Sequence, residues 1–546
     1  MTKDKTYLSL FDEYNKIDNE NILFVAGTGG GKSLALETVA EELHNCGYIV
    51  IFLTDVKDKF EPAFAMFKPE AKWHLETLRR DARNVFREPQ AKPVKIYHPF
   101  TFSFPRKKMP EMRLFTIPIK SIGKEELSVI AETKMETSAI KLFINSLKDL
   151  KRDEGISDLL FYAGQKLEEK TQVRNTKLIR KPDPDNFYLK APISGTQKTL
   201  SEISTYFRPY FYGNHYFFTP DNCKLNFNPI EIFRDQKHYH VLSTKYLVNE
   251  YNVKDEKIAD IVQLNFYKTI LRNIDKCKHP IVFCIDEIRK WLPKKAEGYK
   301  RYLVECMKDD FSTSRSKGKG ITTICATQVY RDIAPAIAGS MSPNEVYIGA
   351  TSDQEDIKRM AESLRLMADE VRQIRQLTRN TFIKKTKEGT DPFKFLVPQH
   401  AHAEPHYDFI QMYARHYLNK MKDYKDVFEY MKELRKKEQA RVREKCNKIL
   451  QIEQEKIKLL QKRRREAKLK KIKSSEKVKP KLNKSKEIMK GVTIEMAKQW
   501  KELYVEKEKS YYEIAKLYGL YMKNGNPYAV KVRMAINKLS ELENEL

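Results

Sequence analysis

The sequence lacks the features that mark membrane and secreted proteins. No run of about 18 or more apolar residues occurs along its 546 residues, so we expect no membrane-spanning helix. The first residues carry no apolar stretch like that of a signal peptide. Seven cysteines are scattered without a Cys-x-x-Cys pair, which argues against a disulfide framework and a zinc site. We therefore expect a protein of the reducing cytoplasm.

Acidic residues are too few to balance the basic ones. Lys and Arg number 102 against 74 Asp and Glu, which leaves a formal net charge of +28 and a pI of about 9.4. A charge of this size indicates a polyanionic partner, and on charge alone both nucleic acid and an acidic membrane surface remain open. The chain length predicts about two to four domains.

The most informative pattern lies in residues 21–43, where an apolar run, a glycine-rich loop and a helix-like stretch follow one another. Glycines let consecutive N–H groups curl around one anion, and the following helix adds its positive end. Lys32 is suited to bind the β- and γ-phosphates of ATP, and the Ser33 hydroxyl is suited to bind Mg²⁺. Ala26 stands where the motif usually has its first glycine, and an ordinary glycine turn is the alternative. The predicted ATP-binding loop consists of Gly27, Thr28, Gly29, Gly30, Gly31, Lys32 and Ser33.

A second apolar run, at 281–285, ends in Asp286 and Glu287. Asp286 is suited to bind magnesium as part of the ATP site, and Glu287 is suited to act as the base that polarises the attacking water. A run of this kind is often purely structural, but its presence beside a phosphate loop favours catalysis.

Two further residues are catalytic candidates. The strand-like run from Ile321 ends at Gln328, whose amide can bond both the γ-phosphate and the lytic water. A glutamine that only caps the strand is the alternative. Arg315 can stabilise the transferring phosphoryl group of a neighbouring subunit, or it is an ordinary solvated loop arginine.

Apolar strands that alternate with helical stretches predict an α/β fold with a doubly wound sheet. We expect a P-loop NTPase (RecA-like) core split by a mostly helical insertion, then a long basic helix and a small all-α domain. The expected segments are the two core parts at 1–60 and 251–405, the insertion at 61–250, the basic helix at 406–473, a linker at 474–490 and the last domain at 491–546.

The last segment has the pattern of a helix-turn-helix. Gly519 suits the C-terminal cap of its first helix, and residues 526–527 suit the start of the second. Lys531, Arg533 and Lys538 would then lie on the helix that contacts DNA. A three-helix bundle that binds protein is the alternative.

Together the motifs resemble the HerA–FtsK superfamily of DNA-pumping ATPases. The resemblance is carried by residues 26–33, 281–287 and 315–328, and it extends over about residues 20–405. It implies a ring, usually a hexamer, that moves DNA, expected to be double-stranded, with ATP between subunits. Lys32, Ser33, Asp286, Glu287 and Gln328 would act in one subunit, and Arg315 would act on the next.

The chain departs from the superfamily pattern in two respects. Its phosphate loop begins almost at once, where HerA carries a β-barrel, and no membrane helices precede it, unlike in conjugative coupling proteins and FtsK. This arrangement suggests a translocase of a mobile element, with packaging or transfer proteins as partners. Two alternatives remain: a nucleotide-switched helix-turn-helix protein that binds DNA, and an origin-type AAA+ ATPase.

Overall fold

The computed structural model describes most of the chain, and the first of its two compact units contains the predicted nucleotide-binding core. The units divide at residues 443 and 444. Within the described part, no helix is both long and apolar enough to cross a membrane. The described residues are 21–53, 68–69, 72–81, 88–108, 112–171, 213–249, 251–313, 321–334, 345–378, 381–385, 390–395, 397–400, 421–476, 487–522 and 526–545.

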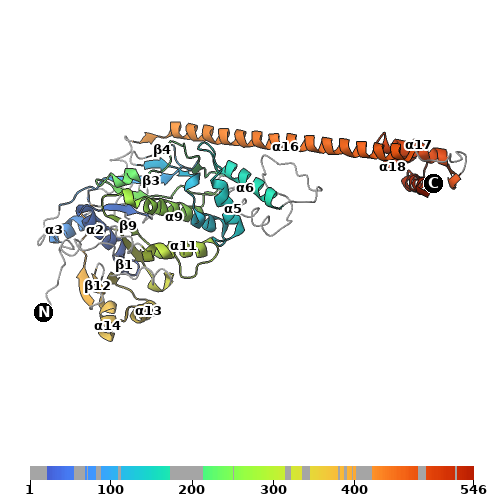
Figure 1. Cartoon of the computed structure of the whole chain (residues 1–546). Coiled ribbons are helices and arrows are strands. Elements are labelled where there is room, and N and C mark those ends of the chain that lie inside the picture. Colours follow the sequence, from blue (N-terminus) through green and yellow to red (C-terminus); the bar gives the residue numbers. More distant parts are fainter. Residues whose placement is uncertain are drawn as a thin grey trace. The chain divides into compact units, whose positions relative to one another are not determined.

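A sheet that includes β1, β3, β9 and β12 forms the centre of the first unit (Figure 1). It has 10 strands in the order β13-β12-β11-β1-β10-β9-β2-β8-β3-β5. All pairs from β11 to β5 are parallel, whereas the β11–β12 and β12–β13 pairs are antiparallel, so that only β12 runs against the other strands. The strands are β1 (Asn21–Val25), β2 (Ile49–Phe52), β3 (Val94–Pro99), β5 (Met112–Phe115), β8 (Tyr239–Leu242), β9 (Ile281–Ile285), β10 (Ile321–Thr327), β11 (Glu345–Gly349), β12 (Thr381–Lys385) and β13 (Thr390–Lys394).

The apolar strands are buried on both faces, as the sequence predicts for a parallel sheet. Leu23 and Val25 of β1 pack in one core cluster, and Ile22 and Phe24 pack in the other, because side chains alternate along a strand. The first cluster includes α4 (Lys124–Ala131), α5 (Ser138–Leu147), α6 (Ile156–Thr171), α9 (Glu256–Arg272) and α11 (Tyr299–Thr313). The second includes α2 (Lys32–Asn45) and the start of α16 (Lys425–Glu476). The doubly wound α/β core is therefore present.

The segment predicted as a mostly helical insertion, 61–250, contributes more to the sheet than expected. The segment contains helices, among them α4, α5 and α6, but it also supplies strands β3, β5 and β8 to the central sheet. The sequence understates this contribution because three strands of four to six residues are too short to carry a clear period-two signal.

Short elements complete the first unit. They are α3 (Lys72–Asp81), β4 (Lys107–Lys108), β6 (Ile117–Pro118), η1 (Ile119–Ser121), β7 (Phe218–Thr219), α8 (Ile230–Phe233), η2 (Ile274–Lys276), α10 (Ile288–Trp291), η4 (Tyr330–Asp332), α13 (Gln354–Leu364), α14 (Ala368–Gln376) and β14 (Lys422–Asp423). Of these, α10 and η4 matter most for function, because they follow β9 and β10 at the same edge of the sheet.

Of the long basic helix predicted for 406–473, the structure contains α16, which has 52 residues, begins at Lys425 and ends at Glu476. Lys422 and Asp423 form β14 instead, and residues 406–420 lie outside the described residues. The predicted linker at 474–490 is wrong at both ends, because α16 enters it and β15 (Glu487–Met489) leaves it. Lysines are good helix formers, so a lysine-rich composition does not by itself end a helix.

The second unit contains a small domain with its own core. The hairpin of β15 and β16 (Val492–Thr493) precedes three helices, α17 (Ile494–Val505), α18 (Tyr511–Leu517) and α19 (Ala529–Glu545). Trp500 is fully buried among apolar residues of all three helices. The domain is thus not all-α, since it opens with a two-stranded sheet.

Gly519 ends α18 as expected, with φ +64 and a Leu520 N–H to Ala515 O bond of 2.9 Å. Pro527 is not in the first turn of α19; it forms a β-bridge with Tyr521. The connection therefore runs through residues 518–528, longer than the turn of about three to four residues in a helix-turn-helix. The helix-turn-helix stays a prediction.

Candidate ATP-hydrolysis site

The glycine-rich loop follows β1 and leads directly into α2. Gly29 and Gly31 have φ of +79 and +94, a region that suits glycine. A Cβ on Gly30 would lie 2.9 Å from the Cβ of Ala26, and one on Gly349 of β11 would lie 2.8 Å from the same atom. These two glycines leave room for the methyl group of Ala26, which explains how the loop accommodates alanine at its first glycine position.

The loop is held by the strands on either side of β1. The Ala26 N–H donates to Thr327 O at 3.2 Å, and the Gly27 N–H donates to Ala350 O at 2.9 Å. Helix α2 begins after Gly31 without a side-chain cap. Its first amide groups are thus available to an anion, and the helix dipole adds to the attraction.

Ser33 and Asp286 meet at the carboxyl edge of the sheet. The Ser33 hydroxyl donates to Asp286 Oδ2 at 3.0 Å, although 253 positions separate the two residues. A hydroxyl and a carboxylate beside a phosphate loop form an oxygen donor set that fits Mg²⁺, which usually binds few protein ligands and several phosphate or water oxygens. Burial raises the pKa of Asp286, with the charge of Lys32 and the Ser33 bond opposing the shift. A bound cation would therefore stabilise its ionised form.

Glu287 lies next in the chain and is held by two cations. Its Oε1 is 2.9 Å from Lys32 Nζ, and its Oε2 accepts a bond of 3.2 Å from Arg289 Nε. The Glu287 backbone has φ +53 and ψ +49, and its N–H donates to Asp286 Oδ1 at 3.0 Å. A left-handed conformation in a residue other than glycine is strained, and such strain is concentrated at functional sites.

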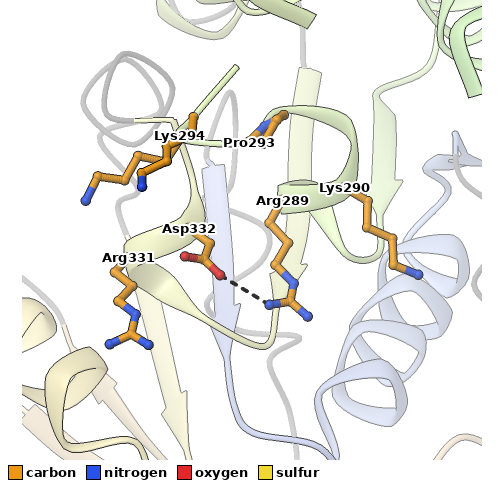
Figure 2. A pocket seen from close by; sticks show the side chains of 7 residues that line it. Arg289, Lys290, Pro293, Lys294, Arg331 and Asp332 are labelled. Atoms are coloured by element: carbon orange, nitrogen blue, oxygen red, sulfur yellow. Dashed lines mark hydrogen bonds and ion pairs between the residues drawn. The ribbon is translucent and has the colours of Figure 1, made fainter. Parts of the chain in front are cut away.

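Arg289 is a site residue that the sequence did not reveal. Its guanidinium donates to Glu287, to Gln328 Oε1 at 3.0 Å and to Asp332 Oδ2 at 3.4 Å. Figure 2 shows the Arg289 side chain facing Asp332. The three acceptors come from the ends of β9 and β10 and from η4. The only sequence signal is a cation two positions after the Asp286–Glu287 pair, which is too common to single it out.

The structure thus gathers most of the predicted site residues in one place. Gln328 joins the cluster through Arg289, and Thr28 lies exposed in the loop. Arg315 lies outside the described residues. In the second unit, Arg533 and Lys538 are exposed on α19, whereas Lys531 is half-buried.

No protein-family model matches this chain, and no curated protein matches it. Some solved structures are similar to it. The bacterial conjugative coupling protein TrwB is 10% identical, with 72% of this chain and 88% of that chain covered and a TM-score of 0.43. VirB4 of Thermoanaerobacter pseudethanolicus is 13% identical, with 70% and 90% covered and a TM-score of 0.40.

A third similar structure is the genome packaging NTPase B204 from Sulfolobus turreted icosahedral virus 2, in complex with ATP-gammaS. It is 14% identical, with 31% of this chain and 71% of that chain covered and a TM-score of 0.23. All three superpositions are loose, so we base the assignment on the chain's own loop, strand order and side-chain contacts. This chain is built on a P-loop NTPase core.

Proposed function

We propose that this chain is an ATP-driven DNA translocase of the HerA–FtsK type. The observation that carries the proposal is the meeting, at one sheet edge, of Lys32 with Glu287 and of Ser33 with Asp286. These pairs join the phosphate loop to the end of β9, and that combination of charge and hydroxyl is what phosphoryl transfer requires.

Different residues of the site bind the phosphates and the magnesium of the substrate. The amides at the start of α2 and the Lys32 ammonium hold the β- and γ-phosphates of ATP. Ser33 and Asp286 would hold magnesium, which would supply neutralising charge to the phosphate oxygens. With these contacts, the γ-phosphate of ATP lies between the phosphate loop and Glu287.

Glu287 acts as the base once its carboxylate is released from Lys32. It then accepts a hydrogen bond from the water that attacks the γ-phosphorus, which breaks the bond to the β,γ-bridging oxygen and yields ADP and phosphate. The Gln328 amide orients the same water or the γ-phosphate. Arg315 of a neighbouring subunit stabilises the charge on the transferring group.

DNA is the polymer that the motor moves, in a ring, usually a hexamer, with ATP sites between subunits. The +28 formal charge supports a nucleic-acid partner, and exposed Arg533 and Lys538 give the last domain cations for DNA phosphates. We further propose that the protein packages or transfers the DNA of a mobile element and has partner proteins in that process.

Displacement of a triplex-forming strand from duplex DNA tests the proposal directly. We expect displacement that requires ATP and Mg²⁺ and that is lost in Glu287→Gln, whereas Glu297→Gln, an exposed control, retains it. Nucleotide-dependent DNA binding without displacement or turnover would instead favour a nucleotide-switched DNA-binding protein.

A further inference from the structure

A hollow of about 550 Å³ opens beside the catalytic cluster, and two segments of the chain line it. One segment is α10 with the residues after it, and the other is η4. Backbone bonds join them, including Lys294 N–H to Asp332 O at 2.8 Å. The lining residues are Arg289, Lys290, Pro293, Lys294, Lys295, Arg331 and Asp332 (Figure 2), which we call the cationic pocket.

The lining of the cationic pocket carries five positive side chains and one carboxylate. Arg331 is already held by Asp353 at 2.9 Å and by Glu355. Among the described residues, no carboxylate pairs with Lys290, Lys294 or Lys295, in contrast to their neighbours Arg289 and Lys300. Three exposed lysines in one hollow leave an excess of positive charge, so the pocket suits an anion.

The chemistry of the lining favours a nucleic-acid backbone over other anions. As far as the structure describes it, the lining has no aromatic side chain on which a base could stack and no amide side chain that could read a base edge. Lysines act as point charges toward phosphate without reading sequence. Lys32 and Ser33 do not line the hollow, so its anion is distinct from the triphosphate held by the phosphate loop.

Arg289 belongs both to the cationic pocket and to the catalytic cluster. Its three bonds to Glu287, Gln328 and Asp332 measure 3.0 to 3.4 Å, longer than the length of about 2.7–2.9 Å that is usual for charge-assisted bonds. A guanidinium divided among three acceptors at such distances is readily redirected. A phosphate in the pocket offers it two oxygens in a planar, bidentate arrangement.

Redirection of Arg289 would change the state of Glu287. Both carboxylate oxygens of Glu287 are engaged by cations, Oε1 by Lys32 and Oε2 by Arg289. In this state the base is poorly placed to accept a bond from water. ATP would draw Lys32 toward its phosphates, and a second anion in the pocket would draw Arg289 away from Glu287.

We propose that the cationic pocket binds a backbone phosphate of duplex DNA. This phosphate binds Arg289 and thereby breaks the contact of Arg289 with the Glu287 carboxylate. This inference rests on the proposed function. Hydrolysis then requires two anions at once, the triphosphate at Lys32 and the DNA phosphate at Arg289. Arg289 is a positioning residue, because it acts through Glu287 and Gln328.

The test measures steady-state ATP hydrolysis by the full chain against the concentration of a mixed-sequence duplex, at several salt concentrations. Lys290, Lys294 and Lys295 are changed to Ala together. The matched control changes Lys432, Lys436 and Lys437 to Ala, three exposed lysines on α16 that remove the same charge. Arg289→Ala and the conservative Arg289→Lys form the second arm, and thermal unfolding establishes that each variant is folded.

The pocket variant is expected to raise the DNA concentration that gives half-maximal stimulation by about tenfold. The slope of log DNA affinity against log salt concentration should become shallower by about 0.9 for each phosphate that the variant no longer neutralises. The control variant should show neither change. Arg289→Ala is expected to raise the DNA-free rate toward the stimulated rate, so that their ratio approaches one, with Arg289→Lys between. Inorganic phosphate should stimulate the wild type only at concentrations far above those of duplex phosphate, because a single free phosphate lacks the long-range attraction of a polyanion.

Three outcomes would overturn the inference. They are a pocket variant that matches the control, an Arg289→Ala variant that is slower yet still stimulated by DNA, and a pocket variant that changes only self-association in sedimentation. The last outcome would mean that an acidic surface of another copy fills the pocket. A wild type without DNA-stimulated hydrolysis would contradict the proposed function itself, which keeps the two failures distinguishable.

Discussion

The catalytic edge of the first unit and the DNA-binding candidate of the second use charge in opposite ways. At the catalytic edge, the side chains of Lys32 and Glu287 are 10% and 12% exposed and are paired with one another. On α19, Arg533 and Lys538 lie exposed beside exposed apolar residues such as Met534. Buried, hydrogen-bonded pairs hold side chains in fixed positions, whereas exposed cations contribute mainly long-range attraction. Substitutions at the first site should therefore act on ATP binding and hydrolysis, and those at the second on DNA affinity and its salt dependence.

The largest effect is expected from Glu287→Gln. The amide keeps the shape of the side chain but cannot act as the base, so turnover should fall by about 10²–10⁴ while ATP binding persists. Single-turnover hydrolysis and nucleotide binding are measured on the same preparation, with Glu297→Gln as the exposed control. Turnover within a few-fold of wild type would require a different base.

Lys32→Ala is expected to weaken ATP binding by about ten- to a hundredfold, because a charge-assisted bond contributes about 1.5–3 kcal/mol. Titration with a fluorescent ATP analogue measures the affinity. Lys436→Ala, on the exposed surface of α16, should leave it unchanged. Equal affinities in both variants would contradict the assignment of the phosphate loop.

The double change of Arg533 and Lys538 to Ala should leave ATP affinity unchanged and weaken DNA binding in the full chain. We expect the slope of log DNA affinity against log salt concentration to become shallower by about 0.9 for each DNA phosphate that the variant fails to neutralise. The matched control changes Lys507 and Lys516 to Ala, both exposed and outside α19. If the control weakens DNA binding as much as the test variant, α19 is not the DNA-contacting helix. That result would favour a protein-binding role for the exposed apolar residues of the domain.

A smaller effect, on pH dependence, is expected from buried Asp260 on α9. Burial raises its pKa to about 7, with the charge of Lys300 and the Tyr299 hydroxyl bond opposing the shift. Between about pH 4 and 7 the folded state holds a proton that the unfolded state releases, so unfolding free energy falls as pH rises through this window and levels off above it. The loss is about 1.4 kcal/mol per unit of pKa separation, as an upper bound.

Asp260→Asn removes this titration. Denaturant unfolding at pH 4.5 and 7.5, chosen to bracket most of the window, should show a smaller loss of stability in Asp260→Asn than in the wild type. Glu305→Gln, exposed on α11, serves as the control and should follow the wild type. Identical pH dependence in all three proteins would show that Asp260 does not titrate in this range.

The contrast between the two regions also explains how far the sequence could predict them. The residue types of the phosphate loop and of the β9 end are fixed by local chemistry, so Lys32, Ser33, Asp286 and Glu287 could be named from the residues alone. The parallel order that places β10 between β1 and β9 depends on pairing across long sequence separations, which no local pattern encodes.

Two features of the molecule were beyond sequence reasoning for the same reason. Arg289 matters because its partners Gln328 and Asp332 approach it through space, 39 and 43 positions away. The connection after Gly519 has the sequence pattern of a tight turn, because glycine marks where a helix ends but not where the next one begins. The sequence therefore predicts the local motifs of this chain well and the contacts between distant elements poorly.

Steady-state ATP hydrolysis by the full chain, measured against increasing duplex DNA, tests the central claim most directly. We predict a Mg²⁺-dependent rate that rises with DNA, saturates, and disappears in Lys32→Ala and Glu287→Gln. A wild-type preparation that is folded and binds ATP, yet hydrolyses none with duplex present, would contradict the account.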